Sequence, residues 1–494
     1  MSDPSTPFSV LPALLVLIPA VAAVAVALLG RLWARAARWT ALAATAAQTV
    51  LALALFQAVA RSGSVRAVLG GFPALAGVEL VVDRLAVPFV VLVAAIGMLV
   101  VAVTSSEPAE SFLALVLLLV SGLTGVFVTG DAFNLYVFLE LAGLSSYALV
   151  ATADTDVAAG AALRYLLVGT VGATLYLLGV GYAYVATGAL NVSLLGQRLG
   201  AGTPAVAAFA LVAVGLGVKV PVVPLHGWLP DAHGEAPVGV SVLLSGLVTT
   251  AGAYALARLV LAAFGIEFLA AVPLARVAVV VGGATSVVVG GLLALRQSKV
   301  KRLLACSTVS QLGLVVLGVG LANRLALTGA VVHLLSHAAL KTGAFLAAGA
   351  IAESTGAKTV REYGGVARRA PLASAALAAA ALGLVGVPPA GVFASKWYLV
   401  AGAVAADAPV LAALVVASSL LSLLYFWRVL ERLVAAGDAG DDSRPPHAND
   451  GSGARTPTGI AVAATLAVLA GVLLGFVAAP LETFLEPTLT ALLE

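Results

Sequence analysis

Apolar residues run almost from end to end of the 494-residue chain, in long stretches that few charged residues interrupt. About 20 consecutive apolar residues are enough for a helix to cross the hydrocarbon core of a bilayer. On this criterion we expect about 14 transmembrane helices, in the segments 8–30, 38–60, 84–104, 111–130, 132–152, 162–187, 204–226, 238–263, 273–295, 302–321, 325–351, 371–400, 409–433 and 458–478. The pattern therefore predicts an all-α polytopic membrane protein.

Composition excludes other classes of protein. The chain is 62% hydrophobic and 10% charged, with a mean hydropathy of +1.11, whereas an ordinary soluble chain carries roughly 25% charged residues. A single cysteine, Cys306, excludes an internal disulfide, an iron–sulfur cluster and a thiolate zinc site. The basic residues are scattered between apolar runs, so we expect no nucleic-acid partner and no cofactor.

The distribution of basic residues predicts the orientation in the plasma membrane. Residues 1–7 carry no positive charge, while Arg31, Arg35 and Arg38 follow the first apolar segment, unlike the order in a cleaved signal peptide. Sixteen of the 26 basic residues lie in loops after odd-numbered segments, and seven lie after even-numbered ones. Because cytoplasmic loops are enriched in Lys and Arg, we expect both termini outside the cell.

Three of the six lysines lie at membrane depth: Lys219, Lys341 and Lys396. A desolvated lysine can release its proton, whereas arginine remains protonated in proteins. A bias of codon usage toward arginine would explain why lysine is scarce, but it would not explain where these three lie. The pattern indicates lysines that carry protons through the membrane.

Glu140 is the corresponding acid, in the apolar segment 132–152. A charge at the bilayer centre costs roughly 2.5–3.5 kcal/mol even on the mildest scale, so the four groups should pair or face a hydrated interior. The alternative is a buried ion pair that only fixes helix packing.

His333, His337 and Lys341 are spaced four residues apart and therefore share one helical face. Such a stripe of titratable groups is typical of a proton relay. Zinc is one alternative, but no acid on that face would supply the third ligand, and we expect no metal site. Histidines that merely form hydrogen bonds between helices are the other alternative.

Prolines interrupt two segments, each beside a lysine. Pro221 and Pro224 follow Lys219, and Pro388 and Pro389 precede Lys396. These are the seventh and twelfth segments, five apart, which predicts two inverted five-helix repeats, helices 4–8 and 9–13. We therefore divide the chain into an N-terminal region (1–110), a first unit (111–263), a second unit (273–433), a polar cytoplasmic loop (434–457) and a C-terminal helix (458–494).

These motifs resemble the D-type component of the Mrp-type multisubunit Na⁺/H⁺ antiporters and, more broadly, the antiporter-like membrane subunits of respiratory complex I. The resemblance is clearest over residues 80–435. It is carried by residues 131–140 (DAFNLYVFLE), which are nearer to the Mrp D pattern, and by 219–237, 301–305 with 310–313, His333, His337, Lys341 and Lys396.

The resemblance implies roles for individual residues. Glu140 and Lys219 would form the ion pair of a first half-channel, Lys396 would end a second, and His333, His337 and Lys341 would link the two. Two departures stand out: Thr250 occupies a position where many relatives have lysine or histidine, and Val238-Gly239 replaces the usual Thr-Pro. Threonine cannot hold a proton in the physiological range.

We accordingly expect a proton-translocating subunit of a cation (Na⁺)/proton antiporter complex in the lipid bilayer, a secondary transporter rather than an enzyme. Its partners would be other membrane subunits, protons and Na⁺. A proton-pumping subunit of a complex I-like oxidoreductase or membrane-bound hydrogenase is the first alternative. A scaffold subunit that no longer conducts, consistent with Thr250, is the second.

Overall fold

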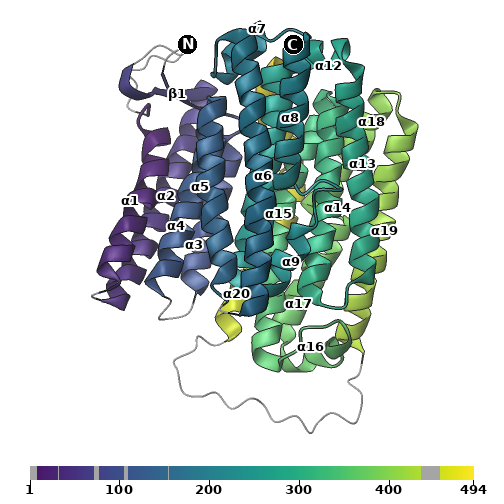
Figure 1. Cartoon of the computed structure of the whole chain (residues 1–494). Helices are drawn as coiled ribbons and strands as arrows, with labels where there is room; N and C mark the ends of the chain where they lie inside the picture. Colours follow the sequence, from purple (N-terminus) through teal and green to yellow (C-terminus); the bar gives the residue numbers. More distant parts are fainter. Residues whose placement is uncertain (1–7, 32, 72–76, 105–108, 154, 436–456) are drawn as a thin grey trace.

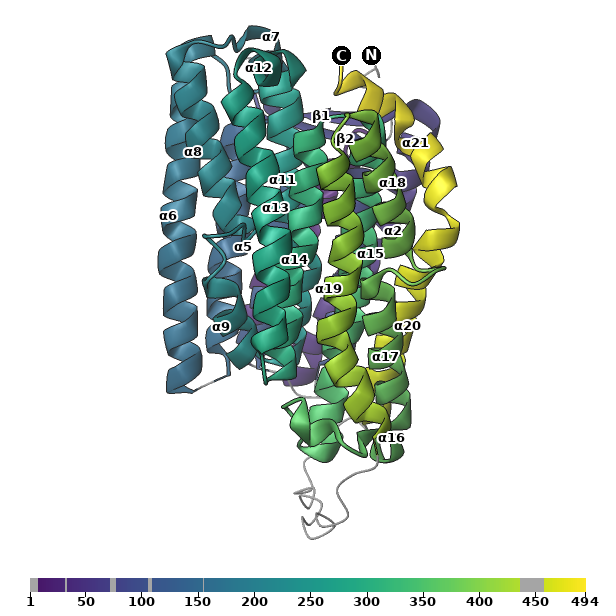
Figure 2. The same cartoon turned by 90° about the vertical axis from the view of Figure 1, so that its right-hand side faces the viewer.

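The computed structural model describes residues 8–31, 33–71, 77–104, 109–153, 155–435 and 457–494, and it shows a bundle of long helices that run roughly alongside one another (Figures 1 and 2). Most of the predicted polar loop 434–457 lies outside these residues. The division of the chain into five regions stays a prediction.

Residues 8–271 contain α1 (Leu11–Leu29), α2 (Ala34–Ser62), β1 (Ser64–Val68), η1 (Leu69–Gly71), β2 (Glu79–Asp83), α3 (Val87–Val103), α4 (Glu110–Val128), α5 (Ala132–Ala151), α6 (Asp156–Thr187), α7 (Val192–Arg198), α8 (Thr203–Lys219), α9 (Trp228–Glu235), α10 (Val238–Leu243), η2 (Leu244–Val248), α11 (Thr249–Arg258), η3 (Leu259–Phe264) and α12 (Gly265–Ala271). The remainder contains α13 (Pro273–Arg296), α14 (Val300–Leu321), α15 (Arg324–Thr355), η4 (Arg361–Tyr363), α16 (Val366–Arg369), α17 (Pro371–Val385), α18 (Gly391–Ala405), α19 (Pro409–Val434), α20 (Pro457–Phe476) and α21 (Ala478–Ala491).

The predicted polytopic helical fold is confirmed. In the described part of the chain, eleven helices are long and apolar enough to cross a membrane, the segment from α10 to α12 counting as one. The shorter apolar helix α3 and two crossings split into α8–α9 and α17–α18 bring the total to the expected fourteen.

Both predicted helix breaks are present, and side chains satisfy the backbone groups that they release. Proline has no N–H to donate and clashes with the preceding turn, so α8 ends at Lys219 and α17 ends at Val385. The indole of Trp228 donates to Val218 O (3.0 Å) at the first break, and Gln311 donates to Leu384 O (3.1 Å) at the second. In Figure 2 both breaks lie near the middle of the bundle.

Successive crossings alternate in direction, so α4 and α13, which begin the two five-helix repeats, run oppositely (Figure 1). The split crossing is the fourth in each repeat, which is the predicted inverted arrangement. The beginning of α1 and the end of α21 lie at the same end of the bundle, as an even number of crossings requires (Figure 2).

Several elements were not predicted. β1 and β2 form an antiparallel hairpin in which Ser64 pairs with Asp83, and η2 and η3 are π-helical turns within the eighth crossing. The region 458–494, predicted as one C-terminal helix, is divided into two helices, α20 and the final helix α21. Its Glu482 accepts hydrogen bonds from Arg324 (3.2 Å) and Tyr398 (2.7 Å).

The ring of Phe484, also on α21, stacks on Phe56 of α2 with 5.3 Å between centroids. The guanidinium of Arg84 lies 5.6 Å from the centre of the same ring. α21 therefore contacts both the N-terminal region and the second unit.

The interior of the bundle is built around α14 and α15, in which the most apolar stretches are completely buried. α14 packs against α13 through small residues, as membrane helices commonly do. A Cβ atom added at Gly313 would lie 2.7 Å from both Gly283 O and Val287 N, so the two backbones approach too closely for any larger residue.

We therefore expect Gly313→Ala to separate α13 from α14 and to lower the free energy of unfolding by about 1–3 kcal/mol, the usual effect of overpacking a core. Gly181→Ala on α6 is the matched control, because nothing lies within 4 Å of its added Cβ. Thermal unfolding midpoints in detergent would measure both changes. Equal midpoints for the two variants would contradict the close approach.

Candidate functional site

The membrane-depth lysines occupy three crossings of the bundle: Lys219 ends α8, Lys341 lies in the middle of α15, and Lys396 lies near the beginning of α18. Lys341 is completely buried, and Lys219 and Lys396 each expose 6% of their surface. The sequence-predicted residues therefore extend from the first repeat through the centre of the bundle to the second.

In the first repeat Glu140 and Lys219 form an ion pair. Lys219 Nζ lies 3.0 Å from Glu140 Oε1 and donates a further hydrogen bond to the hydroxyl of Tyr147 (3.1 Å). Asp131 caps the N-terminus of α5 by accepting from Asn134 N (2.7 Å), which sets the beginning of the helix that carries Glu140 and Tyr147.

An aromatic stack connects this ion pair to the break in the seventh crossing. The ring of Tyr147 meets Tyr165 edge-on at 4.4 Å, and Tyr165 stacks on Trp228 at 4.0 Å. Trp228 begins α9 and caps the carbonyl of Val218, directly before Lys219. The rigid rings therefore hold the lysine at the position where the helix stops.

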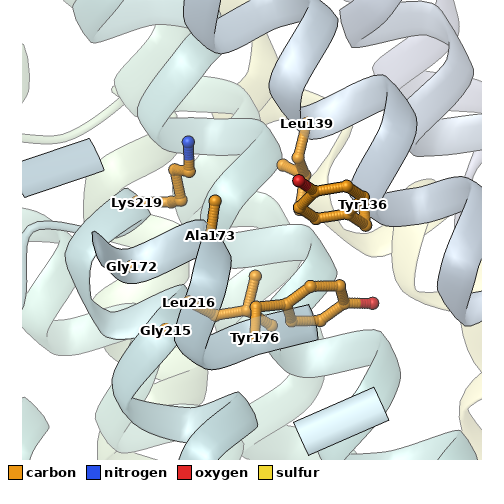
Figure 3. A pocket seen from close by; sticks show the side chains of 8 residues that line it. All are labelled: Tyr136, Leu139, Gly172, Ala173, Tyr176, Gly215, Leu216 and Lys219. Atoms are coloured by element: carbon orange, nitrogen blue, oxygen red, sulfur yellow. The ribbon is translucent and has the colours of Figure 1, made fainter. Parts of the chain in front are cut away.

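A narrow crevice lies beside Lys219, between α5, α6 and α8 (Figure 3). It is lined by Tyr136, Leu139, Gly172, Ala173, Tyr176, Gly215, Leu216 and Lys219. In Figure 3 the Lys219 side chain and the Tyr136 ring lie on opposite sides of Ala173.

Lys341 has a different environment at the centre of the bundle. Its ammonium group donates to Leu304 O (2.6 Å) and to the hydroxyl of Ser307, both on α14. Leu304 O also accepts from Thr308 (3.1 Å), and Thr308 shares a 2.9 Å hydrogen bond with Ser245 of the π-turn η2. Hydroxyl groups therefore connect Lys341 to the eighth crossing.

His337 and His333 precede Lys341 on α15 by four and eight residues, and both are completely buried. Their rings lie 6.2 Å apart and are nearly parallel, at 16°, so the two share a face as their spacing predicts. His333 Nδ1 lies 2.9 Å from the hydroxyl of Ser395, the residue before Lys396. The histidines thus extend from the central lysine to the second break.

Lys396 caps that break directly. Its ammonium group donates to Val385 O (3.2 Å), the last residue of α17, and to the hydroxyl of Ser419 (2.9 Å) on α19. Across the described residues, the ion pairs of the bundle include Lys219 but neither Lys341 nor Lys396. Only one of the three lysines therefore has a carboxylate partner there.

Several buried polar atoms along this path have no partner among the described residues: Thr250 Oγ1, Ser336 Oγ, Thr342 Oγ1, His333 Nε2 and both ring nitrogens of His337. An unsatisfied buried polar group costs about 1–3 kcal/mol. Bound water, which usually satisfies such groups, would also carry protons between the side chains. The arrangement is chemically suited to move protons along the bundle.

Thr250 interrupts the series of titratable groups at the eighth crossing. It is completely buried, and α11 packs closely here, since a Cβ atom on Gly252 would lie 2.9 Å from the backbone of Lys219. The region between Lys219 and Lys341 is therefore lined by hydroxyl groups rather than by a further basic side chain.

Within the described ranges, no group of three or more His, Cys, Asp or Glu residues could hold a metal ion. The ammonium groups of the three lysines are instead hydrogen-bonded to the carboxylate of Glu140 and to single hydroxyls and carbonyls.

Some residues of the site were missed in the sequence. Tyr147 lies seven residues after Glu140, two helical turns along the same face, so its spacing could have revealed it. Ser307 and Ser419 give no such signal, because each meets its lysine only through contacts between distant helices.

Sequence comparison places this site within a known family of sequences. Residues 129–422 match the family described as "NADH:quinone oxidoreductase/Mrp antiporter, TM". The N-type component of NADH-quinone oxidoreductase from Desulforudis audaxviator is 43% identical over 440 residues, which cover 86% of this chain and 87% of the relative. The D-type component of the Na⁺/H⁺ antiporter from Bacillus subtilis is 28% identical over 464 residues, covering 90% and 91%.

Solved structures give the same range of relatives. A chain of the membrane-bound sulfane sulfur reductase, an archaeal respiratory membrane complex, superposes with a TM-score of 0.88 at 30% identity, covering 98% of both chains. A chain of the Mrp complex from Dietzia sp. superposes with a TM-score of 0.85 at 26% identity, covering 99% of this chain and 100% of that one. The comparisons support the broad superfamily and do not single out the D-type Mrp component that the motif at 131–140 favoured.

The ion pair leads to a stability prediction. Glu140→Gln should lower the unfolding midpoint strongly, because breaking a buried ion pair leaves an uncompensated charge and costs about 3–5 kcal/mol. The double variant Glu140→Gln/Lys219→Met removes that charge and should recover part of the loss. Thermal unfolding in detergent would measure both.

Lys299→Met provides the control, because Lys299 forms an ion pair with Glu235 at the surface and its side chain is 51% exposed. We expect this variant to change stability by less than about 1 kcal/mol. A double variant as unstable as Glu140→Gln alone would show that the pair does not act as a unit.

Proposed function

Because the chain belongs to the NADH:quinone oxidoreductase/Mrp antiporter transmembrane family, we propose that it is a proton-translocating subunit of a multisubunit membrane complex. One observation carries the proposal. Buried basic side chains extend from the Glu140–Lys219 pair through Lys341 and two histidines to Lys396. A charged side chain has a high free energy inside the bilayer, so buried charges there usually mark an ion or proton pathway.

The proposed mechanism is electrostatic. When Glu140 takes up a proton or moves away, Lys219 loses its counter-ion in a medium of low dielectric constant, where charge interactions are strong and long-ranged. Lys219 then releases its proton, and the changed field acts on Lys341. The two helix breaks keep polar backbone groups beside the end lysines, which would sustain the water needed for transfer.

The distribution of basic residues supports an orientation in the plasma membrane. The Lys- and Arg-rich loops, including residues 296–302 and 358–369, would face the cytoplasm. Both termini would then lie outside, at the end of the bundle that carries the β1–β2 hairpin (Figure 2).

We propose that electron transfer in a respiratory complex supplies the energy for this proton movement. Two findings support this proposal: the 43% sequence identity to an NADH-quinone oxidoreductase component, and the TM-score of 0.88 with a chain of an archaeal respiratory complex. This chain would move protons and leave the electron transfer to its partners. The second candidate is a Na⁺/H⁺ antiporter. It is supported by the 28% sequence identity to an antiporter component, by the TM-score of 0.85 with a chain of the Mrp complex, and by the motif at 131–140.

Replacement of the path lysines tests proton translocation itself. Lys341→Met and Lys396→Met should each reduce proton uptake by inverted membrane vesicles carrying the complete complex at least about tenfold, since each would remove a proton carrier. Lys299→Met should leave uptake unchanged, because Lys299 lies in an exposed ion pair. If both buried variants take up protons normally while the complex assembles, the protein is a scaffold.

The driving reaction is tested in the same vesicles with the unmodified complex. A reduced electron donor should acidify the vesicle interior, and the acidification should disappear in vesicles from a strain lacking this protein. A Na⁺ gradient applied without any donor should produce no proton movement that requires the protein. If the donor causes no acidification that requires the protein, but a Na⁺ gradient does move protons through it, the chain belongs to a cation/proton antiporter.

A further inference from the structure

One buried histidine lies outside the path described so far. His233, on α9 in the second half of the broken seventh crossing, has no exposed surface. Neither of its ring nitrogens has a hydrogen-bond partner among the described residues. A phenylalanine or leucine would fill the same space without two unsatisfied polar atoms, so simple packing does not explain the imidazole.

The ring of His233 lies against the central lysine's own helix. It stacks on Phe345 of α15 with 4.8 Å between centroids and 10° between planes. Phe345 follows Lys341 by four residues, one helical turn on the same face. The imidazole therefore packs one helical turn away from Lys341 along α15.

That end of the bundle is polar and open to solvent. Lys299 forms an ion pair with Glu235, the last residue of α9, and its side chain is 51% exposed. Lys301 donates a hydrogen bond to Ala236 O, the next residue along. Water and protons therefore reach the residues that surround the end of α9, two to three positions from His233.

The connection between Lys341 and the Glu140–Lys219 pair contains no titratable side chain at Thr250. Thr250 occupies the eighth crossing between the Glu140–Lys219 pair and the centre, and its buried hydroxyl has no partner in the described part of the chain. A hydroxyl can pass a proton along a chain of waters but cannot store one near neutral pH. The imidazole on α9 that packs on the helix of Lys341 is therefore the better carrier.

We propose that protons reach Lys341 from the α9 end of the bundle through His233, by a route that bypasses Thr250. One ring nitrogen of His233 accepts a proton from water beside Glu235 and Lys301. The other ring nitrogen releases a proton to water next to Lys341 Nζ, which leaves the imidazole neutral again. This inference rests on the proposed function, because it assigns the side from which the central lysine is loaded.

A matched pair of substitutions separates proton transfer from a structural role. Gln and Glu have the same size and both form hydrogen bonds, but only Glu can hold a proton. His233→Gln should reduce proton uptake by vesicles carrying the complete complex at least about tenfold, whereas His233→Glu should retain a third or more of it. Arg66→Gln, which changes a side chain that is 52% exposed in the β1–β2 hairpin at the opposite end of the bundle, is the control and should have no effect.

The outcomes are distinguishable when Lys341→Met is measured beside them. Normal uptake by Lys341→Met would overturn the proposed function itself. If Lys341→Met is inactive but His233→Gln is normal, only the His233 route is overturned. Equal losses in His233→Gln and His233→Glu at normal amounts of assembled complex would make His233 a packing residue and would likewise overturn the route.

Discussion

The structure depends on the high free energy of charge and unpaired backbone groups at membrane depth. Each broken crossing releases carbonyl groups, and each membrane-depth lysine needs acceptors. Lys396 meets both needs at once by donating to Val385 O, where α17 ends. Lys341 similarly uses Leu304 O, while Lys219 alone uses a carboxylate. A lysine therefore stabilises the released carbonyl at the second break, whereas Trp228 satisfies the carbonyl at the first.

The proposed proton path would suit complexes that are driven in different ways. The proposed path would require only a carboxylate, amines, imidazoles, hydroxyls and water, and none of these groups depends on an electron donor or on a particular cation. The energy source would then enter through partner subunits. Sequence similarity extends accordingly to relatives named for a quinone oxidoreductase and for an antiporter, over most of the chain in both cases.

Hydropathy and proline spacing predicted the crossings and both breaks, since these features follow from local composition. The same rule placed the end of the seventh segment at 226 and missed α9 (Trp228–Glu235). The charges of Asp231 and Glu235 lower its hydropathy, although Asp231 is paired with Arg302 at 2.6 Å. The serine partners of the lysines depend on contacts between distant helices, and residues 131–140 could not separate two branches of one family.

The final helix α21 has a consequence for how the protein is made. Through Glu482 it holds Arg324 and Tyr398 of the second unit, and through Phe484 it packs on Phe56 near the beginning of the chain. Because α21 follows the last crossing in the chain, its partners on α2, α15 and α18 are all synthesised before it. The contact between Phe56 and Phe484 therefore joins residues far apart along the chain, and it can form only after all of the crossings between them have been synthesised.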